Sequence, residues 1–184
     1  MNTEANLEAV SQFWFHEIDP KKHFLKDADF DTLIASRFGN LVDAIIKNPN
    51  SFSSDSPERR LSLILATDQL TRNIYRNSPK AFAGDEVAIS ITFHAIKMND
   101  LALWENAKRR SFLLMPMMHS EILGIQEASL PLFKKYTLDG TYQYAVRHHD
   151  IIKRFGRFPH RNEILSRDST QEELEFLNTR GSSF

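Results

Sequence analysis

The most constraining feature of this sequence is the spacing of its apolar residues, which recur every three or four positions through most of the chain. That period is typical of one buried face of an α-helix. Residues 29–47 show it most clearly, and the polar segment Asn48-Pro49-Asn50 follows as a helix-ending signal. Similar spacing predicts further helices at 4–16, 57–76, 104–115, 119–136 and 142–155, and a last one opened by a capping box of Ser169 and Glu172.

Individual residues predict where some of these helices begin, bend and end. Ser56 followed by Pro57 is a typical start, since serine caps the free N–H groups and proline fits the first turn. Gly156 is expected to end a helix in the left-handed conformation. Pro116 is expected to stop a helix and Pro131 to bend one, because proline lacks the backbone donor.

One window is ambiguous. Val87, Ile89, Ile91 and Phe93 alternate with small or polar residues, as in a β-strand. We still predict a helix there, because no neighbouring segment offers a partner strand. The expected fold is therefore all-α: a single helical domain over residues 1–184, with about eight helices stacked as antiparallel pairs.

Composition excludes several classes of protein. A chain of 184 residues buries about 70% of its unfolded surface, so it needs no metal or disulfide to hold its core. It has no cysteine, which excludes a disulfide scaffold, a thiolate zinc site and a cysteine nucleophile. The net charge of −1 gives no general attraction to nucleic acid or anionic lipid.

The expected location is the cytoplasm. The first six residues lack the basic segment and apolar run of a signal peptide. The uninterrupted apolar stretches are far shorter than the roughly 20 residues that cross a bilayer. The absence of cysteine suits a reducing compartment. We therefore expect neither a membrane nor a nucleic acid as a partner.

Polar residues gather in three segments where a plain core helix does not need them. The first contains Asp68, Gln69, Arg72 and Asn73. Asp68 shares the apolar helical face of the leucines before it, where a charge is costly unless it is paired. Two interpretations stay open: a structural Asp68–Arg72 pair one turn apart, or part of a ligand site.

The second segment contains His119, Ser120 and Glu121, with Gln126 further along. Ser120 or Glu121 at a helix start is expected to cap the helix, and this is the favoured interpretation. His119 and Glu121 also form a weak metal-ligand pattern, but on a helix they point in different directions.

The third segment is the densest. Residues 147–167 carry six basic residues against two acidic ones, with three histidines. Arginine offers a planar fork to phosphate or carboxylate, so the segment predicts an anion clamp. The alternative is that these arginines tie the C-terminal helices together. The residues singled out are His148, Asp150, Arg154, Arg157, His160, Arg161 and Asn162.

Common catalytic motifs are absent. The sequence has no glycine-rich phosphate loop, no His-Glu-x-x-His pair and no Gly-x-Ser-x-Gly elbow. We therefore expect no cofactor. A Ser-His-Asp triad assembled from scattered residues carries almost no weight.

A longer pattern links the three polar segments to a known family. Its residues are Asp68-Gln69, Arg72-Asn73, Arg76, Pro116, His119-Ser120-Glu121, Gln126, His148, Asp150, the run from Phe155 to Asn162, Arg167, Ser169-Thr170, Glu172-Glu173, Phe176-Leu177 and Ser183-Phe184. In these positions the chain resembles a bacterial domain-of-unknown-function family, number nine-two-four. The resemblance covers nearly the whole chain from Phe13 onward. It implies a helical fold of the tetratricopeptide-repeat-like kind and no established activity.

The chain departs from the family pattern at a few positions. Leu70-Thr71 stands where the family tends to have Phe-Pro, and Ser166 where it tends to have Gly. The loop before Arg59 lacks an expected tryptophan. These differences concern packing and turn shape more than the polar residues.

The leading hypothesis is a pocket for a small anionic ligand, in which a histidine acts as general acid or base and arginines stabilise negative charge. A second hypothesis is a helical module that binds a protein or peptide along an exposed groove. A third, ranked lowest, is a metal-dependent hydrolase. The predicted pocket residues are Asp68, Arg72, His119, Glu121, His148, Arg157, His160 and Arg161, with His119, Glu121, His148 and His160 as catalytic candidates.

We predict that the protein holds no structural metal, because its His and carboxylate spacings do not place several ligands on one helical face. Elemental analysis of protein purified without chelator is expected to find no stoichiometric zinc, iron or manganese. A tightly held ion in that analysis would contradict the prediction and favour the hydrolase.

Overall fold

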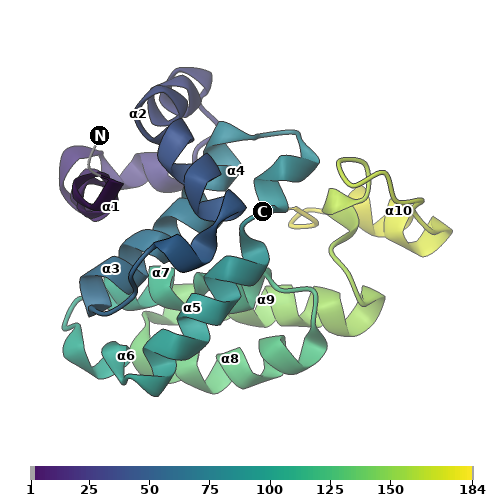
Figure 1. The fold of residues 1–184 in the computed structure, drawn as a ribbon. Coiled ribbons are helices and arrows are strands. Elements are labelled where there is room, and N and C mark those ends of the chain that lie inside the picture. Colours follow the sequence, from purple (N-terminus) through teal and green to yellow (C-terminus); the bar gives the residue numbers. More distant parts are fainter. Residues whose placement is uncertain (1–2, 184) are drawn as a thin grey trace.

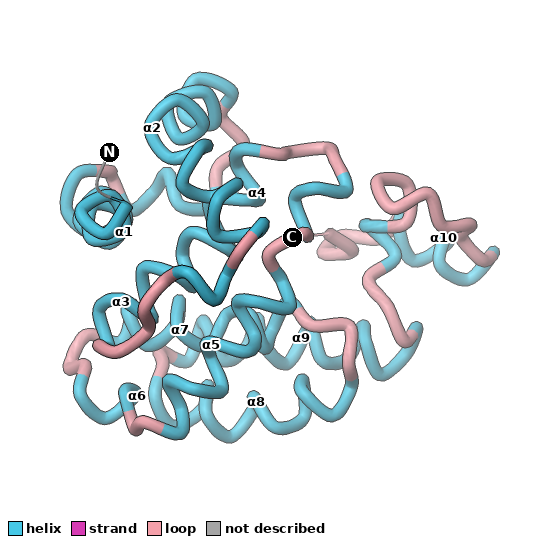
Figure 2. Tube along the Cα trace, in the orientation of Figure 1, coloured by secondary structure: helices cyan, strands magenta, loops and turns pink. Residues whose placement is uncertain are grey.

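Helices make up the regular structure of this protein. A computed structural model describes residues 3–183, and no β-strand occurs within that range (Figures 1 and 2). The all-α prediction is therefore confirmed, and the ambiguous segment 87–93 lies inside a helix. The α-helices are α1 (Thr3–Gln12), α2 (Ala28–Lys47), α3 (Pro57–Ile64), α4 (Thr71–Ile74), α5 (Asp85–Lys97), α6 (Asp100–Leu103), α7 (Ala107–His119), α8 (Leu123–Tyr136), α9 (Asp139–Phe155) and α10 (Gln171–Leu177).

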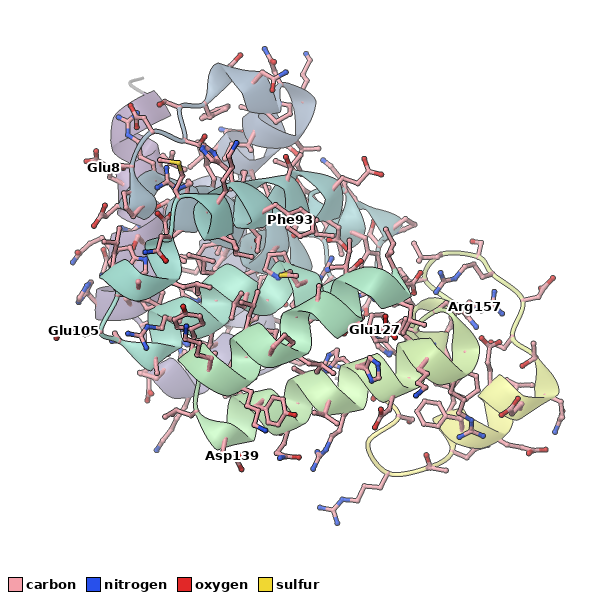
Figure 3. The ribbon with its side chains drawn as sticks, turned by 90° about the horizontal axis from the view of Figure 1, so that it is seen from below. Glu8, Phe93, Glu105, Glu127, Asp139 and Arg157 are labelled. Carbon is pink, nitrogen blue, oxygen red and sulfur yellow. The ribbon has the colours of Figure 1, made fainter. Side chains whose placement is uncertain are left out.

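The helices pack in two ways along the chain. In the second half, α7, α8 and α9 follow one another through short turns and lie side by side (Figures 1 and 3). In the first half, contacts join alternate helices, with α1 against α3, α2 against α4, α3 against α5 and α5 against α7. The last helix, α10, lies beyond α9 at the far side of the molecule from α1 and α2 (Figure 1).

The core has a main part and a small C-terminal part. Trp14, Phe112 and Phe133 are among the largest side chains buried in the main core. The C-terminal part contains Ile152 and Phe158, with aromatic side chains from the end of α9 and from α10 packed against it. The polar residues discussed below lie where these two parts meet.

The predicted helix ends are largely confirmed. The Ser56 hydroxyl accepts a hydrogen bond from the backbone N–H of Arg59, and Pro57 is the first residue of α3. Gly156 ends α9 with φ +70°, in the left-handed region that glycine adopts without steric cost. The capping box that opens α10 is formed by Thr170 and Glu173, one residue later than predicted.

The prediction that Pro116 stops a helix is wrong. Pro116 lies inside α7, which continues to His119, and Pro131 lies inside α8. All residues from Ser111 to Met118 are buried. Tertiary packing on every side of this stretch therefore stabilises the helix despite the lost backbone donor.

The predicted helix over 57–76 is interrupted. A π-helical turn, Leu65–Leu70, separates α3 from α4. Such a turn accommodates an extra residue within a helix and changes the direction of the side chains after it, and it is often found at functional sites. Asp68 and Gln69 lie in this turn, and all of its residues are buried.

Gly84, the residue immediately before α5, lies very close to this π-helical turn. A Cβ atom at Gly84 would lie 2.2 Å from the carbonyl oxygen of Thr67 and 2.9 Å from the Cα of the same residue. No side chain fits there unless the backbone moves. Gly84 therefore sets how near the start of α5 comes to the turn that carries Asp68.

Replacing Gly84 with alanine is expected to destabilise the protein by about 1–3 kcal/mol, because the backbone of Thr67 must shift. Gly39→Ala is the matched control. A Cβ at Gly39 meets nothing within 4 Å, and its mid-helix position predicts a gain of up to about 1 kcal/mol. Urea unfolding of both variants measures the difference, and equal stabilities would contradict this account of Gly84.

Candidate functional site

A buried carboxylate forms the centre of the candidate site. Asp68, in the π-helical turn, has no exposed surface. Its Oδ1 atom lies 2.7 Å from Nδ1 of His119 at the end of α7, and its Oδ2 accepts a hydrogen bond of 2.5 Å from the Gln69 amide. A guanidinium nitrogen of Arg72, one turn on, lies 3.8 Å from Oδ1.

These neighbours keep Asp68 ionised. Burial by itself would raise the pKa of the Asp68 carboxyl. The charge and hydrogen bond of His119, the charge of Arg72 and the hydrogen bond of Gln69 together outweigh burial and lower that pKa to about 2. Asp68 therefore carries a negative charge at neutral pH and orients the His119 ring.

A second histidine lies next to the first. The rings of His119 and His148 are 6.1 Å apart between centroids. Nδ1 of His148 lies 2.8 Å from the backbone oxygen of Tyr144. Burial, followed by the charge of His119, lowers the pKa of His148 to about 3, so this ring is neutral at pH 7. Asp68, Arg72, His119 and His148 form a cluster of polar side chains. Asp150, two residues further on α9, is exposed and lies outside this cluster.

Arg161 is the most buried cation of the cluster. It lies in the 3₁₀ turn Pro159–Arg161 and is only 7% exposed. Its guanidinium carbon is 4.8 Å from the ring centroid of Phe82 and 4.5 Å from that of Phe158. Nη2 donates to the backbone oxygen of His119, at 3.0 Å. Among the residues that the structure describes, Nε is buried and has no hydrogen-bond partner.

Arg161 also faces the other members of the cluster. Its Nη1 atom lies 3.8 Å from Oδ2 of Asp85, the first residue of α5. Burial, and then the like charge of Arg72, lowers the pKa of the Arg161 guanidinium to about 10. An anion placed between these two arginines would relieve their repulsion.

Asp85 is the residue of this cluster that the sequence did not single out. Nη2 of Arg72 lies 2.9 Å from its Oδ1, and Nη1 of Arg72 donates to the backbone oxygen of Ala81. Burial raises the pKa of the Asp85 carboxyl against the opposing charge of Arg72. In the sequence Asp85 looks like an ordinary acidic residue in the first turn of a helix, so no local signal distinguishes it.

Glu121 connects the cluster to the segment 158–167 near the C-terminus. Its carboxylate accepts two hydrogen bonds from Arg167, at 2.7 and 3.0 Å, and one of 2.8 Å from the backbone N–H of Phe158. The His160 ring lies 5.5 Å from that of Phe158, and burial, followed by the charge of Arg161, lowers the pKa of His160 to about 4. These hydrogen bonds give the Glu121 carboxylate a structural role, so its position does not require a role as catalytic acid or base.

Two of the predicted site residues make internal contacts away from Asp68. The amide of Asn73 donates to Asp31 on α2. Gln126, with no exposed surface, donates to the backbone oxygens of Met118 and Ser120. These bonds hold α2 to α4 and the start of α8 to the end of α7.

The predicted anion clamp is mostly paired with acidic residues. Arg157 makes hydrogen bonds of 2.6 and 2.8 Å to Glu173, and Arg154 one of 2.9 Å to Glu172, both in α10. Asn162 also donates to Glu173. Figure 3 shows Arg157 beside the last helix. The alternative interpretation, that these residues tie the C-terminal segments together, therefore accounts for their contacts.

The cluster is reached from the surface through partly exposed side chains. His119 and Arg72 are about a fifth exposed, while Asp68 lies behind them. Two surface hollows, of about 410 and 480 Å³, lie elsewhere. The first is lined by α1, α3 and Arg109, and the second by the loop before α3 and by α5.

Two further searches of the described residues gave negative results. Among the side chains that the structure describes, those of residues 7–183, no group of three or more histidines and carboxylates is arranged to hold a metal ion. No helix in the same range combines the length and the apolar character that crossing a membrane requires.

Comparison with known proteins places the chain in a family. The family model described as a bacterial protein of unknown function, DUF924, matches residues 10–181. A solved structure of a protein of unknown function from Agrobacterium tumefaciens is 31% identical, with a TM-score of 0.88. The match covers 96% of this chain and 99% of the other. No curated protein matches the chain.

The contacts of the C-terminal arginines yield a prediction. Arg157→Gln is expected to destabilise the protein by about 1–3 kcal/mol at pH 7, because Glu173 is almost fully buried and loses its charged partner. The matched control is Arg154→Gln, whose pair with Glu172 is more than half exposed and whose loss is expected to cost under about 0.5 kcal/mol.

The same prediction has a defined pH dependence. Hydrogen bonds from Arg157, against the smaller effect of burial, lower the pKa of Glu173 to about 2 from its ordinary value of 4.5. A lowered carboxyl pKa stabilises the folded state above pH 4.5, and this contribution is lost as the pH falls through 2. The difference between parent and Arg157→Gln should shrink over that interval in denaturant unfolding. A constant difference would contradict the role given to this pair.

Proposed function

The chain belongs to the bacterial DUF924 family of proteins of unknown function, so its own geometry must supply the hypothesis: we propose that it binds a small anionic molecule at Arg161 and Arg72 and that His119 exchanges a proton with it. The observation that carries the proposal is the hydrogen bond between the buried Asp68 and His119 beside Arg161.

The arginine pair supports the anionic class of ligand. Arg161 is held between two phenylalanine rings, which fix the plane of its guanidinium. Its Nε–H has no acceptor among the groups that the structure describes, and a buried donor without an acceptor is unfavourable. A carboxylate or phosphate oxygen would satisfy this donor and interact with Arg72 as well.

The Asp68–His119 pair supports proton transfer. A carboxylate at Nδ1 fixes the tautomer and orientation of an imidazole, which leaves Nε2 to accept or donate a proton. No hydrogen bond from Nε2 of His119 is found in the described part of the chain. His148 and His160 lie close by, but their lowered pKa values make them neutral neighbours instead of bases that take up protons near pH 7.

The binding residues in this proposal are fewer than the sequence suggested. They are Asp68, Arg72, His119 and Arg161, with Asp85 added. These side chains converge on one place, whereas a module that binds a protein or peptide along a groove would spread them. The proposal also includes a cytoplasmic location. It further includes a tetratricopeptide-repeat-like arrangement of the helices, and the contacts of α1 with α3, α3 with α5 and α5 with α7 support that arrangement.

Thermal unfolding with sodium acetate and sodium phosphate tests the proposal. A ligand at a hundredfold excess over its Kd stabilises by about 2.7 kcal/mol, or about 5–10 °C in Tm for a domain of this size. We expect such a rise in the parent and in Arg154→Gln, but not in Arg161→Lys, which keeps the charge and loses the planar fork. If neither acetate nor phosphate raises the Tm of the parent, or if the rise in Arg161→Lys equals that of the parent, the proposal is contradicted.

A further inference from the structure

The surface hollow of about 410 Å³ lies between α1, α3 and the start of α7 and shares no residue with the cluster around Asp68. We call it the α1–α3 hollow; Glu8, Ser62 and Arg109 are among its lining residues. Figure 3 shows Glu8 at the opposite end of the molecule from Arg157. The volume falls within the range of small-molecule pockets. All nine residues that line it are polar or charged, which favours a polar ligand.

Arg109, in the first turn of α7, brings a cation to this hollow. Its guanidinium carbon lies 5.0 Å from the ring centroid of Phe15 and 4.5 Å from that of Trp104. Both rings attract the charge and restrict the guanidinium. Arg109 makes no hydrogen bond and no ion pair with any group that the structure describes. Its N–H donors are therefore available to an acceptor in the hollow.

Two buried serine hydroxyls line the same hollow. Ser62, on α3, is 1% exposed and Ser11, on α1, is 9% exposed. Neither hydroxyl makes a hydrogen bond within the described part of the chain. A hydroxyl withdrawn from bulk water without a partner is unfavourable. A polar molecule in the hollow would satisfy both hydroxyls, so they point to a ligand independently of Arg109.

Carboxylates line the hollow without pairing with its arginines. Glu8 lies on α1 and Glu58 in the first turn of α3. Neither forms an ion pair with a side chain that the structure describes. Arg59, the other arginine of the hollow, lies 3.9 Å from Asp55, which is not a lining residue. The α1–α3 hollow therefore presents charges of both signs that do not neutralise each other through direct contact.

We infer that the α1–α3 hollow binds a small zwitterion, a free amino acid with a polar side chain, whose carboxylate contacts Arg109 and whose ammonium group contacts Glu8 or Glu58. A simple anion would meet Arg109 but also the two carboxylates, and like charges placed together are unfavourable. A simple cation would meet the arginines. A molecule that carries both charges pairs with both kinds of side chain, and the serine hydroxyls bind its remaining polar groups. This inference goes beyond the proposed function and does not depend on it.

Isothermal titration calorimetry with L-glutamine and L-serine tests the inference, and we expect binding at millimolar concentration. N-acetyl-L-glutamine lacks the ammonium charge, and L-glutamine amide lacks the carboxylate. Each is expected to bind at least about tenfold more weakly than L-glutamine, because each loses one charged contact. L-leucine is expected to bind more weakly than L-glutamine, because the lining is polar. The Trp104 indole N–H signal in NMR spectra reports binding locally, since this ring stacks on Arg109.

Variants locate the site. Arg109→Gln is expected to weaken L-glutamine binding by about tenfold or more. Ser62→Ala is expected to weaken it by about threefold and to leave Tm unchanged, because this hydroxyl has no partner among the described residues. Arg147→Gln is the matched control: it removes the same charge from an exposed position on α9 and should bind L-glutamine like the parent. Circular dichroism checks that each variant keeps the parent fold.

Two further variants test the ammonium contact and the independence of the site. At least one of Glu8→Gln and Glu58→Gln is expected to weaken L-glutamine binding by about threefold, since both carboxylates are exposed. Arg161→Lys, which alters the anion site proposed above, should bind L-glutamine like the parent.

The outcomes that overturn the inference differ from those that concern the proposed function. No heat and no shift of the Trp104 signal with either amino acid overturns the site. Equal binding of N-acetyl-L-glutamine or of the amide overturns the zwitterion, and equal binding of L-leucine overturns the polar side chain. Unchanged affinity in both Arg109→Gln and Ser62→Ala, or lost affinity in Arg161→Lys, overturns the location. A failure of acetate and phosphate to raise Tm contradicts the proposed function alone.

Discussion

The side chain of Asp68 is almost completely buried, so its charge must be balanced inside the protein. An uncompensated buried charge costs several kcal/mol, a large fraction of the stability of a domain of this size. Two of the groups that balance this charge, Gln69 and Arg72, are close to Asp68 in sequence. The third, His119, is distant in sequence and lies at the end of α7. This requirement holds the end of α7 against the π-helical turn.

The position of α7 in turn determines where the C-terminal segment lies. Arg161 donates to the backbone oxygen of His119, and Glu121 accepts from the backbone of Phe158 and from Arg167. Each of these bonds joins the end of α7, or the residues just after it, to the segment 158–167. The small C-terminal core is thereby attached to the main one through polar contacts as well as through apolar packing.

The arginines of the C-terminal run are divided between two tasks. Arg154 and Arg157 pair with acidic residues of α10, and Arg167 pairs with Glu121, so these charges are used to hold segments together. Arg161 differs because its hydrogen bond goes to a carbonyl and its nearest carboxylate, Asp85, is 3.8 Å away. A cation stabilised mainly by a dipole and by aromatic rings keeps the capacity to attract an anion.

Local patterns in the amino-acid sequence predict the all-α class, most helix positions and the glycine that ends α9, because periodicity, capping and left-handed turns are local properties. They also identify Asp68, His119 and Arg161 as polar residues that a plain helix does not need. Asp85 joins these residues, Arg157 does not, and Pro116 remains inside a helix. These three features depend on charge pairing and burial between residues distant in sequence, which no local pattern records.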